Sequence, residues 1–124
     1  MFVFSQITSF NSDLSNLVNG SRMFGLSNLA SFSADLSNLV NGKDMFADSQ
    51  LTSFNSNLCS LEDGRDMFYG CTLDEESLQN ISLTIKDVTN VEGEHILGLG
   101  NISFELDYED IISTIERKGW TVSF

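Results

Sequence analysis

The chain has 124 residues, enough for one small domain. Its 18 Asp and Glu outnumber its 6 Lys and Arg, and the resulting net charge of −12 argues against binding to nucleic-acid phosphates or anionic membranes. A hydrophobic content of 41% predicts that it folds. No apolar run is long enough to span a membrane, and the opening MFVFSQ lacks the features of a signal peptide. We therefore expect neither membrane insertion nor a targeting signal in this chain.

Residues 1–73 contain an internal repeat with a step of 22 residues. The pair Met-Phe begins at residues 1, 23, 45 and 67. Four apolar slots keep the same step, namely Ile7/Leu29/Leu51/Leu73, Phe10/Phe32/Phe54, Leu14/Leu36/Leu58 and Leu17/Leu39/Leu61. A glycine at 20, 42 and 64 punctuates each copy and is expected to allow the positive φ of a tight turn. A unit of this length suits a leucine-rich-repeat coil, with a strand near residues 10–14.

The period breaks at Leu73, and two helices and two strands are predicted beyond it. A helix over about 75–88 begins either at a capping box of Thr72 and Glu75 or at Asp74. Residues 95–99 predict a short buried strand. A second helix ends at Gly119, before a closing strand over 120–124. The apolar stripes of the two helices are Leu78, Ile81, Ile85 and Val88, and Tyr108, Ile111, Ile112 and Ile115.

These elements predict an α/β solenoid: leucine-rich-repeat coils with a parallel sheet over residues 1–73, closed by an αβαβ cap over 74–124. The coil segment comprises three repeats and the start of a fourth, and the cap is continuous with it. A strand–helix–strand order implies a right-handed crossover onto the same parallel sheet. Met1 begins in mid-repeat, so either further repeats precede it in a longer protein or the N-terminal coil associates with a second copy, as a two-fold homodimer.

Two columns of small side chains follow the same step. Both cysteines replace serine in them, which predicts two buried small side chains; a disulfide or a reactive thiol is the alternative. The columns are Ser5/Ser27/Ser49/Cys71 and Ser15/Ser37/Cys59.

Signals for catalysis are weak. His95 is the single histidine and begins an apolar strand, which favours a structural role over membership of a catalytic triad. The chain lacks the HExxH, CxxC and P-loop motifs, and two cysteines with one histidine do not complete a standard zinc site. We expect no enzyme activity, no cofactor and no metal.

The outward positions of the predicted strands form a row of small polar side chains. Such a row can hydrogen-bond carbohydrate hydroxyls or a protein partner, and it is the candidate binding face. The alternative is that a sheet open to water simply requires polar residues there. The row consists of Asn11, Asp13, Ser33, Asp35, Asn55 and Asn57.

The repeat resembles a known family. LTSF at 51–54 and MFYGC at 67–71 resemble the repeat of BspA-like leucine-rich-repeat surface proteins, and SFNSDLSNL at 9–17 resembles related FN-x-DLS repeats of bacterial lipoproteins and surface proteins. The tail is similar to the segment that closes such repeats in proteins of gut bacteria and their phages. Proline is absent here, and Met replaces the usual Ala before Phe.

The resemblance covers about residues 1–73, and it implies exposure on a cell or virion surface and a role in adhesion or protein binding. It supplies no catalytic residue. We expect a non-enzymatic interaction or attachment module of a larger bacterial surface or phage tail protein. The alternative is a purely structural capping segment that terminates a repeat stalk.

Overall fold

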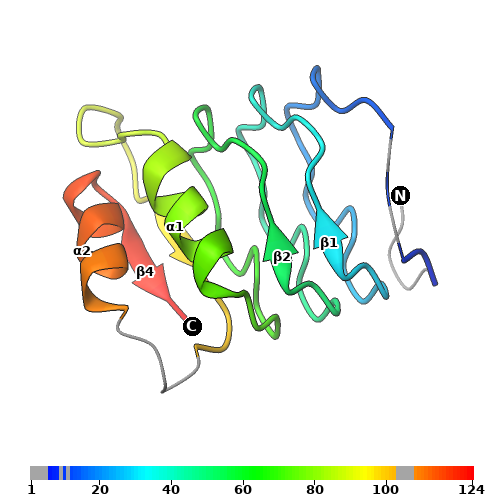
Figure 1. Ribbon diagram of the computed structural model, residues 1–124. Coiled ribbons are helices and arrows are strands. Elements are labelled where there is room, and N and C mark those ends of the chain that lie inside the picture. Colours follow the sequence, from blue (N-terminus) through cyan, green and yellow to red (C-terminus); the bar gives the residue numbers. More distant parts are fainter. Residues whose placement is uncertain (1–5, 9, 11, 103–107) are drawn as a thin grey trace.

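The computed structural model describes residues 6–8, 10, 12–102 and 108–124. The described part contains two helices and two separate parallel sheets of two strands each (Figure 1). Their order is β1 (Ser31–Phe32), β2 (Ser53–Phe54), α1 (Glu75–Thr84), β3 (Ile96–Gly98), α2 (Glu109–Arg117) and β4 (Thr121–Ser123). Within these residues no helix is long and apolar enough to cross a membrane.

The predicted α/β solenoid of leucine-rich-repeat coils, with one parallel sheet and an αβαβ cap, is wrong. The structure is a small α/β domain with two separate two-stranded sheets, β1 paired with β2 and β3 with β4. The strand predicted near residues 10–14 is not among the strands of the described residues. The crossover strand β4 therefore joins β3 and not the sheet formed by the Phe32 and Phe54 segments.

Helix α1 explains why the first sheet stops after β2. The backbone N–H of Asp74 still bonds to the carbonyl of Thr52, at 2.8 Å, but the chain then turns into α1. Polar side chains on one face of α1 form hydrogen bonds with the backbone of β2 and of the residues that follow it. A third strand next to β2 would have paired with this backbone. The side chains are Ser77, which accepts from Phe54 N at 2.7 Å, Asn80, which donates to Ser56 O at 2.9 Å, and Thr84, which accepts from Leu58 N at 3.3 Å.

Contacts between neighbouring units nevertheless keep the 22-residue step. Gly20 N–H donates to Asn41 O and Gly42 N–H to Asp63 O, each at 2.8 Å. The rings of Phe24 and Phe46 stack with centroids 5.6 Å apart, and those of Phe46 and Phe68 do the same. The apolar slots of the repeat therefore form a continuous core from Phe24 to Leu73.

The repeat glycines do not have the positive φ that the sequence predicted. Positive φ falls instead on Arg22, Asp44 and Asp66, and on Leu26, Asp48 and Gly70. The glycine slot is required by packing, because a Cβ on Gly42 would lie 2.9 Å from Met67 Sδ. The backbone at Gly42 thus lies so close to the Met67 side chain that a residue with a Cβ would not fit.

The elements of the C-terminal third are largely as predicted. Helix α1 ends at Thr84 and not near residue 88, and its cap is Asp74, whose side chain accepts from Ser77 N; the Thr72–Glu75 capping box is not used. Helix α2 and the strands β3 and β4 lie within or close to their predicted ranges, and β3 and β4 are parallel. Gly119, with φ of +96°, follows the end of α2.

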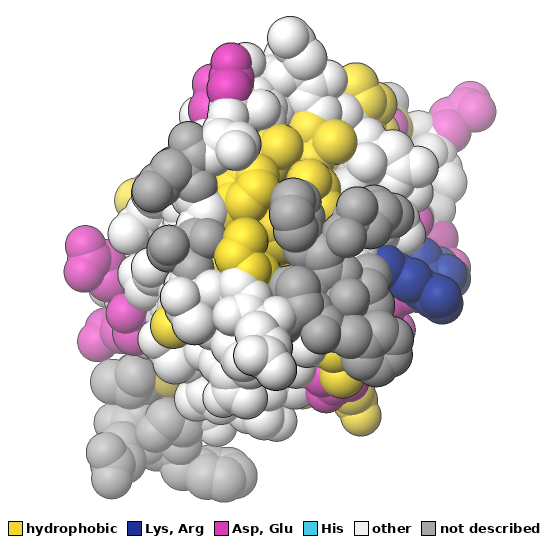
Figure 2. All heavy atoms as spheres, turned by 90° about the vertical axis from the view of Figure 1, so that its right-hand side faces the viewer, with side chains coloured by type: hydrophobic (Ala, Val, Ile, Leu, Met, Phe, Trp, Pro, Cys, Tyr) yellow, Lys and Arg dark blue, Asp and Glu magenta, His cyan; other side chains and the backbone are white. Residues whose placement is uncertain are grey.

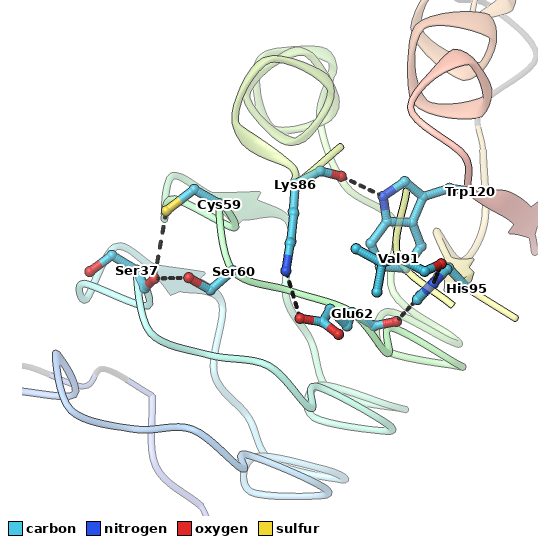
Figure 3. A network of polar contacts seen from close by, with 8 residues as sticks. All are labelled: Ser37, Cys59, Ser60, Glu62, Lys86, Val91, His95 and Trp120. Carbon is cyan, nitrogen blue, oxygen red and sulfur yellow. Dashed lines mark hydrogen bonds and ion pairs between the residues drawn. The ribbon is translucent and has the colours of Figure 1, made fainter. Parts of the chain in front are cut away.

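Only one of the two small-residue columns is buried. Ser27, Ser49 and Cys71 are buried as predicted, whereas Ser5 lies outside the described residues. The prediction for the second column is wrong, because Cys59 is exposed and Ser15 and Ser37 are half-buried. The Cys59 thiol lies on a surface turn, 3.5 Å from Ser37 O (Figure 3), and both cysteines are free thiols.

Candidate functional site

The predicted polar row lies on the surface of the molecule. Five of its six members are exposed, namely Asp13, Ser33, Asp35, Asn55 and Asn57; Asn11 lies outside the described residues. Parallel pairing of Phe32 with Phe54 brings Ser33 next to Asn55, one residue beyond each strand. The structure thus aligns these side chains across successive units.

Local turns hold three side chains of the row, those of Asp13, Asp35 and Asn57, in place. Asp13 Oδ1 accepts from Ser15 N at 2.8 Å, Asp35 Oδ1 from Ser37 N at 2.9 Å and Asn57 Oδ1 from Cys59 N at 2.9 Å. These are Asx turns, which bend the backbone away from an extended course just past β1 and β2. The side chains are therefore oriented before any ligand arrives.

The same bonds set the charge of the row. The backbone N–H of Ser15 lowers the pKa of Asp13, and that of Ser37 lowers the pKa of Asp35, because each stabilises the carboxylate form. Each carboxylate keeps a second oxygen, and Asn57 keeps its amide NH₂ group, for a ligand. Asn55 adds another amide, whose side chain makes no bond within the described part of the chain. The row offers acceptors and donors to hydroxyl or amide groups and disfavours anions.

A second polar cluster surrounds His95, which is buried (Figure 3). Its Nδ1 lies 2.8 Å from the carbonyl oxygen of Glu62 and its Nε2 lies 3.1 Å from that of Val91. The Glu62 carboxylate contacts Lys86 Nζ at 2.6 Å, and Trp120 Nε1 donates to Lys86 O at 2.9 Å. The cluster joins the last repeat, the segment after α1, the loop before β3 and the residue before β4.

Sequence reasoning placed His95 at the start of the β3 segment but missed its partners. Glu62 and Lys86 lie 24 residues apart and belong to different segments, so no local pattern links them. Their spacing is close to the 22-residue step that other contacts between units follow, and this step could have indicated that the two residues lie near each other.

The described residues give little support for catalysis. No group of three or more His, Cys, Asp or Glu side chains among them could hold a metal ion. The Cys71 thiol is buried and donates to Phe46 O at 3.1 Å, and burial raises its pKa, which disfavours the reactive thiolate. Glu75 and Glu76 are exposed in the first turn of α1, where the helix dipole favours acids.

Searches against protein-family models, curated proteins and solved structures found no match to this chain. The BspA-like resemblance therefore stays a prediction from the sequence.

Proposed function

We propose that the chain is a non-enzymatic interaction or attachment module of a larger bacterial surface or phage tail protein. Its ligand is a protein or a glycan, bound along the polar row. The observation that carries this proposal is the exposure and alignment of Asp13, Ser33, Asp35, Asn55 and Asn57 across successive units.

Rigidity of the row supports binding. A ligand that meets side chains already held by Asx turns immobilises few rotamers, which lowers the entropic cost of association. The carboxylates of Asp13 and Asp35 favour neutral glycans or peptides with cationic and hydroxyl side chains.

A glycan array and a pull-down with a variant that carries both Asn55→Ala and Asn57→Asp test the proposal. Asn57→Asp keeps the acceptor of the Asx turn and removes the amide donor, so the fold is retained. We expect reproducible binding by the wild-type chain and its loss in this variant. Gln50→Ala, an exposed position outside the row, is the matched control and should bind normally. Equal binding by all three proteins would exclude the row as the site.

The alternative function is structural: the segment terminates a repeat stalk and binding occurs elsewhere. It is supported by a difference between the two ends of the repeat region. At one end α1 satisfies the backbone of β2, whereas at the other end Leu14 and Leu17 are half-buried although their equivalents Leu36 and Leu39 are fully buried. Figure 2 shows hydrophobic side chains gathered in the middle of that N-terminal face.

Extension of the chain separates the two functions. A copy of residues 23–44 placed directly before Met1 keeps the 22-residue register, and a shuffled version of the same residues is the control. If the segment terminates a stalk, the copy should raise Tm by about 5–10 °C and the shuffled version should not. If the wild-type chain binds nothing in either assay and the copy raises Tm, the structural function is favoured.

A further inference from the structure

The two ring nitrogens of His95 each lie against a backbone carbonyl oxygen. The carbonyl oxygens of Glu62 and Val91 lie 2.8 and 3.1 Å from its two ring nitrogens. A carbonyl oxygen accepts hydrogen bonds and cannot donate one. Both ring nitrogens must therefore carry a proton for both contacts to be hydrogen bonds.

Only the imidazolium form of histidine has two N–H donors. A neutral ring would keep one bond and turn the lone pair of its other nitrogen toward a carbonyl oxygen. In a buried position this is costly, because the hydrogen bond is lost and the two facing lone pairs repel each other. The geometry thus favours the charged ring although burial opposes it.

The surroundings supply compensation for the charge. Trp120 packs beside the His95 ring in an edge-type arrangement, with centroids 5.8 Å apart. The Glu62 carboxylate, shared with Lys86, adds negative charge on the repeat side. The other charged residues of the packed segments are Asp63, Asp87, Glu92, Glu94 and Lys118, of which Lys118 Nζ bonds to carbonyl oxygens at the end of α1.

We propose that His95 is a proton-dependent clamp that holds the loop before β3 against the last repeat unit. In its charged form the ring bonds to Glu62 and Val91 at once and thereby ties the β3–β4 region to the repeats. Release of one proton to solvent removes one of these bonds and loosens this junction. The device responds to pH near neutrality, where histidine titrates.

The direction of the pH effect follows from these contacts. The Glu62 carbonyl, and to a lesser extent the Val91 carbonyl and the Glu62 carboxylate, raise the pKa of His95 against the opposing effect of burial. The unfolded chain has a histidine pKa of about 6.5. Because the folded pKa is higher, the stabilisation is fully present below about pH 6.5 and is lost as the pH rises through the folded value.

Long-range ¹H–¹⁵N NMR on the full chain reads the ring directly, since His95 is the single histidine. We expect both ring nitrogens to be protonated at low pH, and the ring to lose one proton with a pKa above the unfolded value. A pKa at or below the unfolded value would overturn the proposal.

Hydrogen exchange tests whether the effect is local to the junction. Thr121 N–H donates to His95 O at 2.8 Å and Val88 N–H to Lys118 O at 2.7 Å, whereas Phe46 N–H donates to Met67 O within the repeats. After correction for intrinsic exchange, protection of Thr121 and Val88 should fall several-fold between pH 6 and 8.5 while that of Phe46 stays constant. Equal loss at Phe46, or none at Thr121, would contradict a clamp at this junction.

The variant His95→Gln supplies the matched control, because its amide can donate to a carbonyl but does not titrate. We expect its exchange at Thr121 to be independent of pH over this range. If the variant is too unstable for exchange measurements, the NMR titration of the wild-type ring still decides the protonation state.

Discussion

The backbone N–H of Phe54 donates to the side-chain oxygen of Ser77 at 2.7 Å, which joins β2 to the first turn of α1. Both residues are buried. Ser77 also donates through Oγ to Asp74, the cap of the helix. One hydroxyl thus satisfies a strand edge and supports a helix start.

Replacement of this hydroxyl should destabilise the domain. In Ser77→Ala the buried N–H of Phe54 loses its acceptor, which costs about 1–3 kcal/mol. Urea denaturation monitored by circular dichroism measures the change. Gln79→Ala, on the exposed side of α1, is the control and should lie within about 0.5 kcal/mol of wild type. A loss at Ser77 no larger than at Gln79 would show that α1 does not depend on this contact.

Aromatic packing in the centre of the repeats should be the most sensitive feature of the core. Phe32 is 2% exposed, and its ring centroid lies 5.0 Å from that of Phe46 and 6.0 Å from that of Phe54. Phe32→Ala should cost about 3–5 kcal/mol in the free energy of unfolding. Phe10 is only half-buried, so Phe10→Ala should cost less. An equal or greater loss at Phe10 in a monomeric sample would contradict this order.

The sequence predicted the inside of this molecule better than its secondary structure. Apolar slots at a 22-residue step identified the buried residues Leu29, Phe32, Leu36 and Leu39 because burial follows hydrophobicity directly. The extent of the strands depends on where backbone groups find partners, and there tertiary contacts dominate. Ser77, Asn80 and Thr84 of α1 replace a third strand, and nothing in their local sequence reveals which backbone they bind.

The candidate sites show the same division. Asp35, Asn55 and Asn57 are exposed, as strand alternation predicted, although they lie past the ends of β1 and β2. The role of Asp35 and Asn57 in Asx turns was not predicted, although Asp and Asn are typical of such turns. The partners of His95 lie four and 33 residues away in sequence, and only the folded chain brings the distant one, Glu62, to the ring.

Close packing of the repeat glycine should make Gly42 intolerant of a side chain. In Gly42→Ala the new Cβ would lie 2.9 Å from Met67 Sδ and 3.2 Å from Leu61 Cδ1, a clash that costs about 1–3 kcal/mol. A double-mutant cycle with Met67→Ala, followed by chemical denaturation, measures how much of this penalty comes from the contact with Met67. The penalty of Gly42→Ala should shrink markedly when Met67 is truncated. A penalty that is unchanged in the Met67→Ala background would assign it to the backbone.

The turn at Asp35 should add to stability in its charged form. Because the Ser37 N–H lowers the pKa of Asp35 below the unfolded value of about 3.9, this contribution is present above about pH 3.9 and is lost as the pH falls through the folded value. Asp35→Asn keeps the acceptor, as Asn57 does in the next unit. We therefore expect Asp35→Asn to unfold at a lower pH than wild type in an acid titration followed by tryptophan fluorescence. Asp35→Ala, which lacks the acceptor, should be less stable than wild type at pH 7, and a stability equal to wild type would show that the turn contributes nothing.

Association of the isolated chain through its N-terminal unit is the remaining prediction. Val18 is 54% exposed, and Leu14 and Leu17 of the same unit are only half-buried, so contact with a second copy would remove apolar surface from water. A two-fold pair closes on itself and leaves no further site for growth. The net charge of −12 opposes the contact, and added salt should therefore strengthen it by screening.

Light scattering at low and moderate salt measures this association, and two variants locate it. Val18→Asp places a charge on the N-terminal unit and should abolish the dimer. Leu83→Asp changes an even more exposed apolar residue, 78% exposed on α1, and should leave the dimer intact. Loss of association in Leu83→Asp alone would move the interface to the helical side of the molecule. A wild-type chain that stays monomeric at high concentration and moderate salt would show that its N-terminal apolar surface is too small or too well covered to bind a second copy.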